Sequence, residues 1–187
     1  MSGPEQASVF FSLLTVFAQL AVFVWIALTL LAQPSSRGAV ARFRARIAAS
    51  VGPMALWLAV LVAGTCMTGS LYFSEVADFT PCKLCWFQRV CMYALVPILA
   101  IGAIRGDRNV RPYATSLALI GAPISAYHYM LERFPNLEAG ACDTSNPCTI
   151  VWFWRFHYIS LPMMALTGFA AVLMLLSIHR TSEVAHG

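Results

Sequence analysis

Five long apolar stretches constrain this chain more than any other feature of its sequence. At 1.5 Å per helical residue, the first reaches roughly 36 Å, which exceeds the ~30 Å hydrocarbon core of a bilayer. The chain is 59% hydrophobic and only 11% charged, whereas a soluble domain carries about 25% charged residues. The sequence therefore predicts an all-α membrane protein with five spanning helices, at about 9–32, 51–73, 86–104, 113–131 and 158–178.

The first stretch is predicted to be a retained helix and not a cleaved signal peptide. A signal peptide has a basic region before a short apolar segment. Here the residues before Val9 include Glu5 and no Lys or Arg, and the apolar run is long. We therefore divide the chain into an N-terminal transmembrane helix with an Arg-rich cytoplasmic loop over 1–50 and a four-helix unit over 51–187.

Charge alternates between the segments that connect the apolar stretches. The segment 74–81 contains Glu75 and Asp78 and no basic residue, whereas 33–50 and 105–112 hold Arg37, Arg42, Arg44, Arg46, Arg105, Arg108 and Arg111. Arg-rich loops stay in the cytoplasm, so we expect the N-terminus and both cysteine-bearing loops outside and the C-terminus inside. No basic cluster is interleaved with stacking aromatics, so no nucleic-acid partner is expected.

The most informative motif stands where a polar loop becomes the third apolar stretch. There Cys82-Lys83-Leu84-Cys85 places two thiols three residues apart, a spacing that suits a disulfide, a metal site or electron transfer. We expect Cys85 in the first turn of a helix, where free backbone N–H groups and the helix dipole stabilise a thiolate. The thiolate is the reactive form. Taken alone, this pair leaves a redox role and a structural disulfide equally open.

A second pair, Cys142 and Cys148, lies in the last external loop. Asn146-Pro147 and small polar residues between the two cysteines favour a tight turn, so the sulfurs could meet. So small a ring would stabilise the fold by only ~2–2.5 kcal/mol. The remaining cysteines, Cys66 and Cys91, fall inside apolar stretches and are expected to be small buried hydrophobes.

Two cysteine pairs on one outer face favour thiol–disulfide exchange between them. Disulfides persist outside the cytoplasm, and nearby disulfides exchange by thiolate attack. Electrons would pass from an external thiol protein to the second pair, then to the first, and then to a lipid-soluble acceptor near Cys85. A four-sulfur zinc site is the competing interpretation. However, its close pairs usually enclose two to four residues, fewer than lie between Cys142 and Cys148.

The run from Cys82 to Arg89 resembles the signature of the disulfide bond formation protein B (DsbB) family, especially its BdbC branch. That signature is Cys-x-Leu-Cys, an aromatic pair, Gln or Glu, and Arg. The second pair, Ala126–Tyr129 and Ile159–Pro162 resemble this branch as well. The resemblance covers about 51–178 and implies a DsbB-like four-helix transmembrane redox domain, here with one extra N-terminal helix.

The resemblance also implies an activity. It is that of a quinone-dependent thiol oxidase in the bacterial cytoplasmic (inner) membrane, with redox loops facing the periplasm or cell exterior. The cofactor would be ubiquinone or menaquinone. The partner would be a DsbA-like thioredoxin-fold dithiol oxidase.

Carried over by position, the resemblance gives each cysteine a role. Cys85 would face the quinone, with Cys82 as its disulfide partner. Cys142 would be attacked by the external partner, and Cys148 would exchange with Cys82.

Arg89 and His128 would bind the quinone, and no metal site is implied. A guanidinium one turn beyond Cys85 stabilises a thiolate or a reduced quinone oxygen. The alternative for Arg89 is snorkelling to lipid head groups. The alternative for His128 is a packed interfacial histidine.

Three other functions remain open at this point. Vitamin K epoxide reductase-like oxidases have a similar bundle and similar chemistry, but their loop cysteines precede the Cys-x-x-Cys, the reverse of the order here. The second is a membrane protein whose external disulfides only brace loops. The third is a metal-binding membrane protein.

Overall fold

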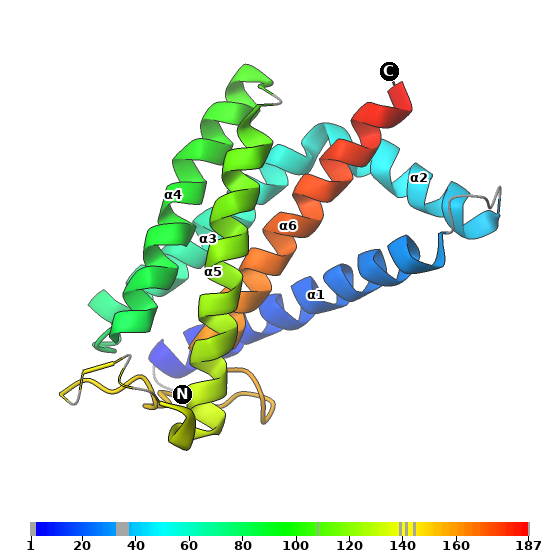
Figure 1. Ribbon diagram of the computed structural model, residues 1–187. Helices are drawn as coiled ribbons and strands as arrows, with labels where there is room; N and C mark the ends of the chain where they lie inside the picture. The colour runs from blue at the N-terminus through cyan, green and yellow to red at the C-terminus, as the bar shows by residue number, and fades with distance from the viewer. Residues whose placement is uncertain are drawn as a thin grey trace.

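The computed structural model describes residues 3–32, 38–107, 109–138, 140, 142–143 and 145–186, with the backbone alone for 183–186. Arg37 and Arg108, two of the expected cytoplasmic arginines, lie outside these residues. The described chain is helical with no β-strand, which confirms the expected all-α class (Figure 1). Its elements are α1 Gly3–Leu31, α2 Ala39–Val51, η1 Gly52–Met54, α3 Ala55–Glu75, α4 Lys83–Arg105, α5 Val110–Arg133, η2 Pro135–Leu137 and α6 Leu161–His186.

In the described chain, four helical stretches are long and apolar enough to cross a membrane. The first is α1, and the second is the continuous helical run that includes α2 and α3. The third is α4, and the fourth is α6 as far as Ser182. The fifth expected span, 113–131, lies in α5. That helix is long enough at 24 residues but less apolar, since it carries Ser125 and His128. Both side chains are buried, in a helix that packs against α4 and α6, so protein rather than lipid surrounds them.

Two boundaries differ from the sequence prediction. The expected Arg-rich loop over 33–50 is wrong in part, because 39–51 forms helix α2. Its Ala and Arg residues are good helix formers, and Ile47 and Ala48 bury its inner side in the core. The last span was expected from Tyr158, but α6 begins at Leu161. Reciprocal backbone hydrogen bonds between Arg155 and Ile159 close a tight turn just before it.

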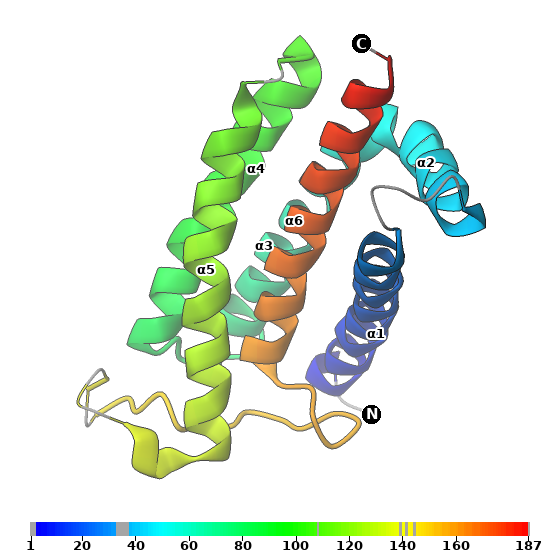
Figure 2. The same ribbon diagram turned by 45° about the vertical axis from the view of Figure 1, so that its right-hand side comes forward.

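Helices α3, α4, α5 and α6 form a ring in which each packs against its neighbours (Figures 1 and 2). Small residues on the buried faces permit close approach, as is usual between membrane helices. Gly121 of α5 faces the ring of Phe169 on α6 so closely that an added Cβ would clash with it. Leu95 and Leu99 fill the centre. The expected four-helix bundle with one extra N-terminal helix is confirmed.

Helix α1 lies outside this ring and packs against α6 (Figure 2). Its buried residues are Ser8, Ser12, Thr15 and Trp25, whereas Phe17, Phe23 and Leu30 are about three-quarters exposed. This pattern is the reverse of a water-exposed amphipathic helix. Apolar residues on the exposed face and polar residues on the buried face are typical of a helix whose outer face contacts the apolar chains of lipid.

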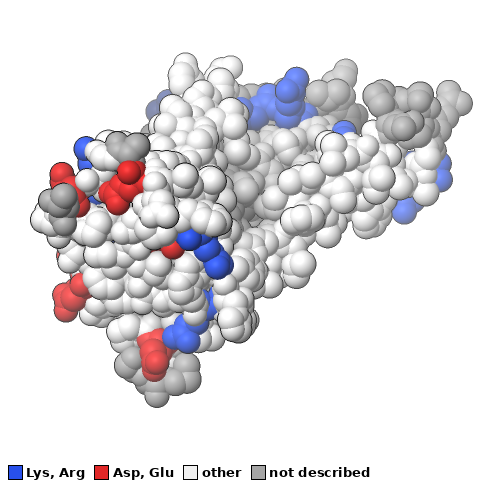
Figure 3. Space-filling view, turned by 60° about the horizontal axis from the view of Figure 1, so that its bottom comes forward, with Lys and Arg blue, Asp and Glu red and all other residues white. Residues whose placement is uncertain are grey.

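The cysteine-bearing loops gather at one end of the bundle, with the start of α1, whereas the C-terminus lies at the other (Figure 1). We call the first of these the cysteine end; it comprises 76–82, 134–160 and the adjoining helix ends. Acidic and basic side chains both occur there, whereas much of the adjoining flank is uncharged (Figure 3). The acidic ones include the exposed Glu75, Asp78 and Asp143. The expectation that both cysteine pairs share one end is confirmed.

Candidate functional site

The Cys-x-x-Cys pair stands at the start of α4. Pro81 ends the loop, Cys82 is the N-cap residue in an extended conformation, and the helix begins at Lys83. Cys85 is therefore in the first turn, as expected, and its backbone N–H donates to Cys82 Sγ at 3.4 Å. Both cysteines are free thiols, and their sulfur atoms are 3.0 Å apart.

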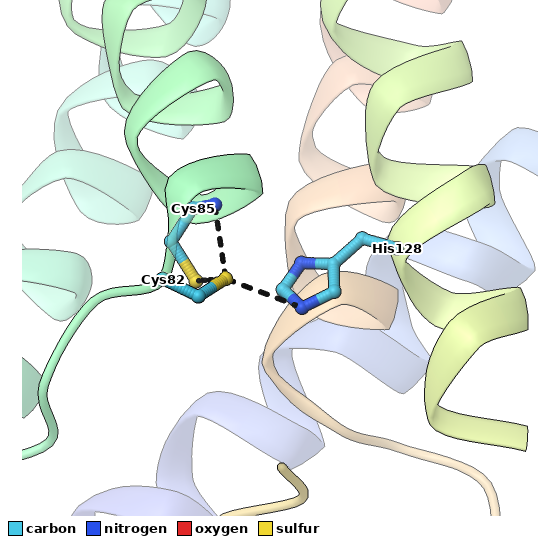
Figure 4. A group of neighbouring side chains, drawn as sticks. All are labelled: Cys82, Cys85 and His128. Carbon is cyan, nitrogen blue, oxygen red and sulfur yellow. Dashed lines mark hydrogen bonds between the residues drawn. The ribbon is translucent and has the colours of Figure 1, made fainter. Parts of the chain in front are cut away.

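His128 reaches this pair from α5 (Figure 4). Its ring is only 3% exposed, with Nε2 at 3.6 Å from Cys82 Sγ and Nδ1 at 2.9 Å from Nε2 of Gln88. Since an amide nitrogen donates, Nδ1 accepts, and the hydrogen of the neutral ring is then on Nε2. Gln88 thereby sets the tautomer that directs an N–H at the Cys82 sulfur.

The groups that stabilise a thiolate converge on Cys82. Its pKa lies well below the ordinary thiol value, first because the Cys85 thiol hydrogen-bonds to it and then because His128 does, while burial opposes both effects. Cys82 precedes the spanning part of α4. The sequence argument assigned helix-terminus stabilisation to Cys85. The structure corrects this, because the free N–H of the first turn belongs to Cys85 but points at Cys82 Sγ.

The second pair lies against the first. A disulfide joins Cys142 to Cys148, and Cys148 shares a buried cluster with Cys82, Leu84 and Leu131. The side-chain amide of Asn146 donates to the Pro81 carbonyl at 3.0 Å and fastens the loop there. Cys148 is 1% exposed, whereas Cys142 is half-buried. All four expected site cysteines therefore meet, and the disulfide leaves no four-thiolate zinc site.

Arg89 is anchored inside the bundle. Its guanidinium donates from Nε to the hydroxyl and from a terminal nitrogen to the carbonyl of Ser70 on α3, both at 3.0 Å. It also lies 5.2 Å from the ring centre of Trp86. These contacts hold it against α3, whereas a snorkelling arginine extends to head groups.

A cavity of about 450 Å³ opens from the pair into the apolar interior. Its polar end is lined by Cys85, Gln88, Arg89 and His128, and its walls come from α1, α3, α4 and α6. Cys66, expected as a packing residue, lines it as well. At the mouth, Phe79 stacks on Trp152 with ring centres 4.5 Å apart. The cavity suits a ligand with a polar head and a long apolar tail.

A buried carboxyl group adjoins this site. Glu132 follows the span expected to end at Leu131 and is only 8% exposed. Among the described residues, its Oε2 has no hydrogen-bond partner. Burial raises the pKa of Glu132 to about 7, against the opposing effects of Ser160 and His128. Its carboxyl group therefore keeps its proton to a higher pH than an exposed glutamate does.

Sequence reasoning did not assign four of these residues. Two had a usable signal: Gln88 follows Cys85 by three positions, and Glu132 follows His128 by four, so each pair shares a helix face. Ser70 and Asn146 had none, because their contacts depend on how distant segments pack.

The first pair with its histidine also has the spacing of a metal site. One ligand atom from each of Cys82, Cys85 and His128 lies within 4.8 Å of the others. Two sulfurs and an imidazole nitrogen suit zinc, which usually takes four ligands in structural sites and three plus water in catalytic ones. The geometry thus permits thiol–disulfide chemistry and a three-ligand metal centre.

Comparison with known proteins narrows this choice. A family model described as disulfide bond formation protein DsbB matches residues 52–179. Disulfide bond formation protein C of Bacillus subtilis (strain 168) is 40% identical over 121 residues, which cover 64% of this chain and 86% of that protein. Probable disulfide formation protein C 2 of Bacillus anthracis is 42% identical over 123 residues, 66% of this chain and 88% of that protein. No solved structure matches the chain.

Proposed function

The chain belongs to the DsbB family of disulfide bond formation proteins, and on that premise we propose that it is a quinone-dependent thiol oxidase. It reoxidises an extracytoplasmic DsbA-like dithiol protein of thioredoxin fold and passes the electrons to membrane quinone. Helices long and apolar enough to span and membership of this family support a multi-pass membrane enzyme.

One observation carries the proposal. The Cys82–Cys85 pair lies between the Cys142–Cys148 disulfide and the apolar cavity. Cys82 shares a buried cluster with Cys148, and Cys85 lines the cavity wall. A sulfur pair that borders both a second disulfide and an apolar cavity is positioned to transfer electrons between them. A disulfide that only braces a loop needs neither neighbour.

The exchange steps follow the exposure of the sulfurs. A thiolate of the partner attacks Cys142, the more exposed sulfur, and Cys148 leaves as a thiolate. The second partner thiol then attacks the mixed disulfide, so the partner gains a disulfide and Cys142 and Cys148 hold its two electrons. Cys148 next attacks Cys82 of an oxidised Cys82–Cys85 pair, and Cys85 leaves as a thiolate. Cys142 then attacks Cys148 of this mixed disulfide, which releases Cys82 as a thiolate and closes the outer disulfide again. The electrons then reside on the Cys82 and Cys85 thiols, the arrangement found in the structure.

The polar end of the cavity fits a quinone head group. Quinone accepts two electrons and two protons, which balances the oxidation of Cys82 and Cys85 to a disulfide. Arg89, fixed by Ser70, places a positive charge where a reduced oxygen needs stabilisation. His128 holds an N–H toward the Cys82 sulfur and stabilises its thiolate.

We further propose the bacterial cytoplasmic membrane as the location, with the cysteine end facing the periplasm or cell exterior. The distribution of arginines supports this orientation, because the helix ends at the opposite end carry arginine while the cysteine end carries Arg133 and Arg155 beside acidic residues. Arg105 ends α4, Arg111 is in the first turn of α5, and Arg180 is near the end of α6. Basic segments of this kind are retained in the cytoplasm.

The test is a coupled oxidation assay with the purified full-length protein. A reduced thioredoxin-like dithiol protein in excess is mixed with a soluble quinone, and absorbance follows quinone reduction while thiol titration follows the partner. We expect one quinone reduced per partner disulfide formed, with less than one metal ion per ten protein molecules.

Stoichiometric zinc bound through Cys82, Cys85 and His128, with no quinone reduction, would favour the metal centre instead. Partner oxidation that proceeds at the same rate without quinone would contradict the acceptor assignment.

A further inference from the structure

Helix α1 lies outside the part of the chain that the family model matches, which begins at residue 52. It nevertheless forms one wall of the cavity next to Cys85. The lining residues on this helix are Phe11, Leu14, Thr15, Phe17, Ala18 and Ala21. The cavity of this protein is therefore built in part by a segment outside the range that the family model matches.

The contacts of α1 with the rest of the protein are specific. The Gln19 amide donates to Thr167 of α6 at 3.1 Å, and its carbonyl oxygen accepts from the Tyr158 hydroxyl at 2.8 Å. Near the other end of α1, the Trp25 indole donates to Ser177 at 2.8 Å. Hydrogen bonds at both levels fix the rotation of α1 about its axis, and so fix which residues face the cavity.

Aromatic packing closes the wall near the cysteine end. Phe11 lies against Gly69 of α3, where an added Cβ would be 2.9 Å from its ring, and its ring centre is 5.8 Å from that of Phe73. The Thr15 hydroxyl donates its hydrogen to the Phe11 carbonyl, so this hydrogen is not available to a ligand in the cavity. The wall that α1 contributes is consequently apolar.

The cavity is elongated and differs in polarity along its length. Its α3 lining extends from Leu58 to Ser74, about 24 Å at 1.5 Å per helical residue. The polar side chains of Cys85, Gln88, Arg89 and His128 lie at one end. The α1 residues Ala18 and Ala21 line the cavity, as do Ala165 and Gly168 of α6. Small side chains on both walls leave room for a flexible apolar chain.

We propose that α1 is part of the acceptor site and that its Phe11, Ala18 and Ala21 hold the apolar tail of the lipid-soluble acceptor. The helix thereby determines how long a tail the enzyme uses well. This inference rests on the proposed quinone-dependent function, whose head-group site it extends.

The direct test is photolabelling of the wild-type protein in detergent. The probe is a quinone with a tail of several isoprene units that carries a diazirine at its far end. Digestion and mass spectrometry locate the adduct. We expect label on α1 between residues 11 and 21, removed by competition with the same quinone lacking the diazirine. Label confined to α3–α6 under the same competition overturns the proposal.

Substitution provides the second test. Ala18→Phe and Ala21→Phe fill the tail part of the cavity, and Ala27→Phe is the matched control because Ala27 is an exposed α1 residue outside the lining. Overpacking of this kind should raise the KM for a long-tailed quinone about ten-fold. It should leave the KM for a tailless quinone with the same head within about two-fold, and the control should change neither.

The outcomes separate this inference from the proposed function. Wild-type protein that reduces no quinone, but is labelled on α1 with competition, would retain the tail site and reject the oxidase. Wild-type protein that reduces quinone, with Ala18→Phe and Ala21→Phe unchanged for long tails, would retain the oxidase and reject the tail site. An equal rise in KM for tailless and long-tailed quinones would also reject it.

Discussion

The two cysteine pairs share one end of the molecule but are held in different ways. Cys82 and Cys85 begin a helix, and side chains from α4 and α5 converge on the Cys82 sulfur. Cys142 and Cys148 lie in irregular chain, where the contacts of their described loop residues with the first pair include the Asn146 hydrogen bond and the packing of both cysteines against the cluster of Cys82. The surroundings of the first pair lower the pKa of the Cys82 thiol. The surroundings of the second pair leave Cys142 more exposed than Cys148.

This contrast suggests a division of labour. The helix pair needs a rigid surrounding because hydrogen bonds must point at one atom to stabilise a thiolate there. In the proposed reaction, the loop pair admits another protein while Cys148 stays next to Cys82.

The largest expected effect separates the two pairs. Cys82→Ser should lower the rate of quinone reduction by at least about 10³-fold. This loss should occur whether a protein or a small dithiol such as dithiothreitol supplies the electrons. The double variant Cys142→Ser with Cys148→Ser should stop only the protein-driven reaction and keep the small-dithiol rate within about ten-fold, because small thiols can attack Cys82–Cys85 directly. Both rates are measured from quinone absorbance.

The control for these variants is Cys91→Ala, a core cysteine outside the cavity lining, which should keep both rates. If the double loop variant still oxidised the protein partner at the wild-type rate, the partner would attack the helix pair directly. The loop pair would then be dispensable, and the proposed relay through it would be wrong.

An intermediate effect tests whether Arg89 serves the acceptor side alone. Arg89→Ala should lower the apparent quinone affinity or rate about ten- to a hundred-fold, since a lost charge-assisted contact is typically worth roughly 1.5–3 kcal/mol. Arg89→Lys should recover only part, because lysine keeps the charge without the planar fork that donates to Ser70. The measurement is quinone reduction over a range of quinone concentrations with reduced partner in excess.

Exchange between the partner and Cys142–Cys148 should proceed normally in Arg89→Ala. Quinone kinetics identical to wild type would remove Arg89 from the acceptor site and leave its contacts with Ser70 as a purely structural feature.

The smallest effect concerns pH and the first pair. The pKa of Cys82 is lowered, so its thiolate persists on acidification and is lost only when the pH falls through that lowered value. His128→Ala removes one of the stabilising contacts and should raise the pH midpoint of Cys82 alkylation by roughly one unit, the equivalent of about 1.4 kcal/mol. Peptide-resolved mass spectrometry after iodoacetamide treatment of reduced protein gives the midpoint.

Gln88→Leu should move this midpoint in the same direction but less far, because the imidazole remains while its orienting amide is lost. A midpoint unchanged in both variants would mean that the thiol and the backbone N–H of Cys85 account for the lowered pKa of Cys82 without His128.

The sequence predicted those features of the fold that depend on a property shared by many residues, such as hydropathy or charge. Hydropathy identified α1, α3, α4 and α6, and arginine placement correctly grouped the two cysteine loops at one end. Motif spacing placed Cys85 in a first helical turn. It assigned thiolate stabilisation to the wrong sulfur, because the direction of a backbone N–H depends on the extended conformation of Cys82.

Features that depend on a few distant contacts were not predictable. Helix α2 was expected to be a loop because its arginines suggested exposure, while its burial depends on α6. The Ser70–Arg89 contact joins residues 19 apart on different helices, and no local pattern signals it. The polar side of α1 was visible as Ser8, Ser12, Thr15 and Gln19, spaced for one helix face, but its partners could not be deduced.

Those partners have a consequence for assembly during synthesis. Gln19 and Trp25 bond to residues 148 and 152 positions later in the chain. At about 5–20 residues per second, a ribosome needs roughly 8–30 s to make that much chain. Through that interval α1 is inserted without its final neighbours. The hydroxyls of Ser12 and Thr15 donate hydrogen bonds to carbonyls one turn earlier in their own helix. These two hydroxyls therefore have hydrogen-bond partners before α6 is made. Gln19 and Trp25, by contrast, reach their partners only after α6 emerges. Helix α1 is therefore made first but is among the last helices to pack in its final position.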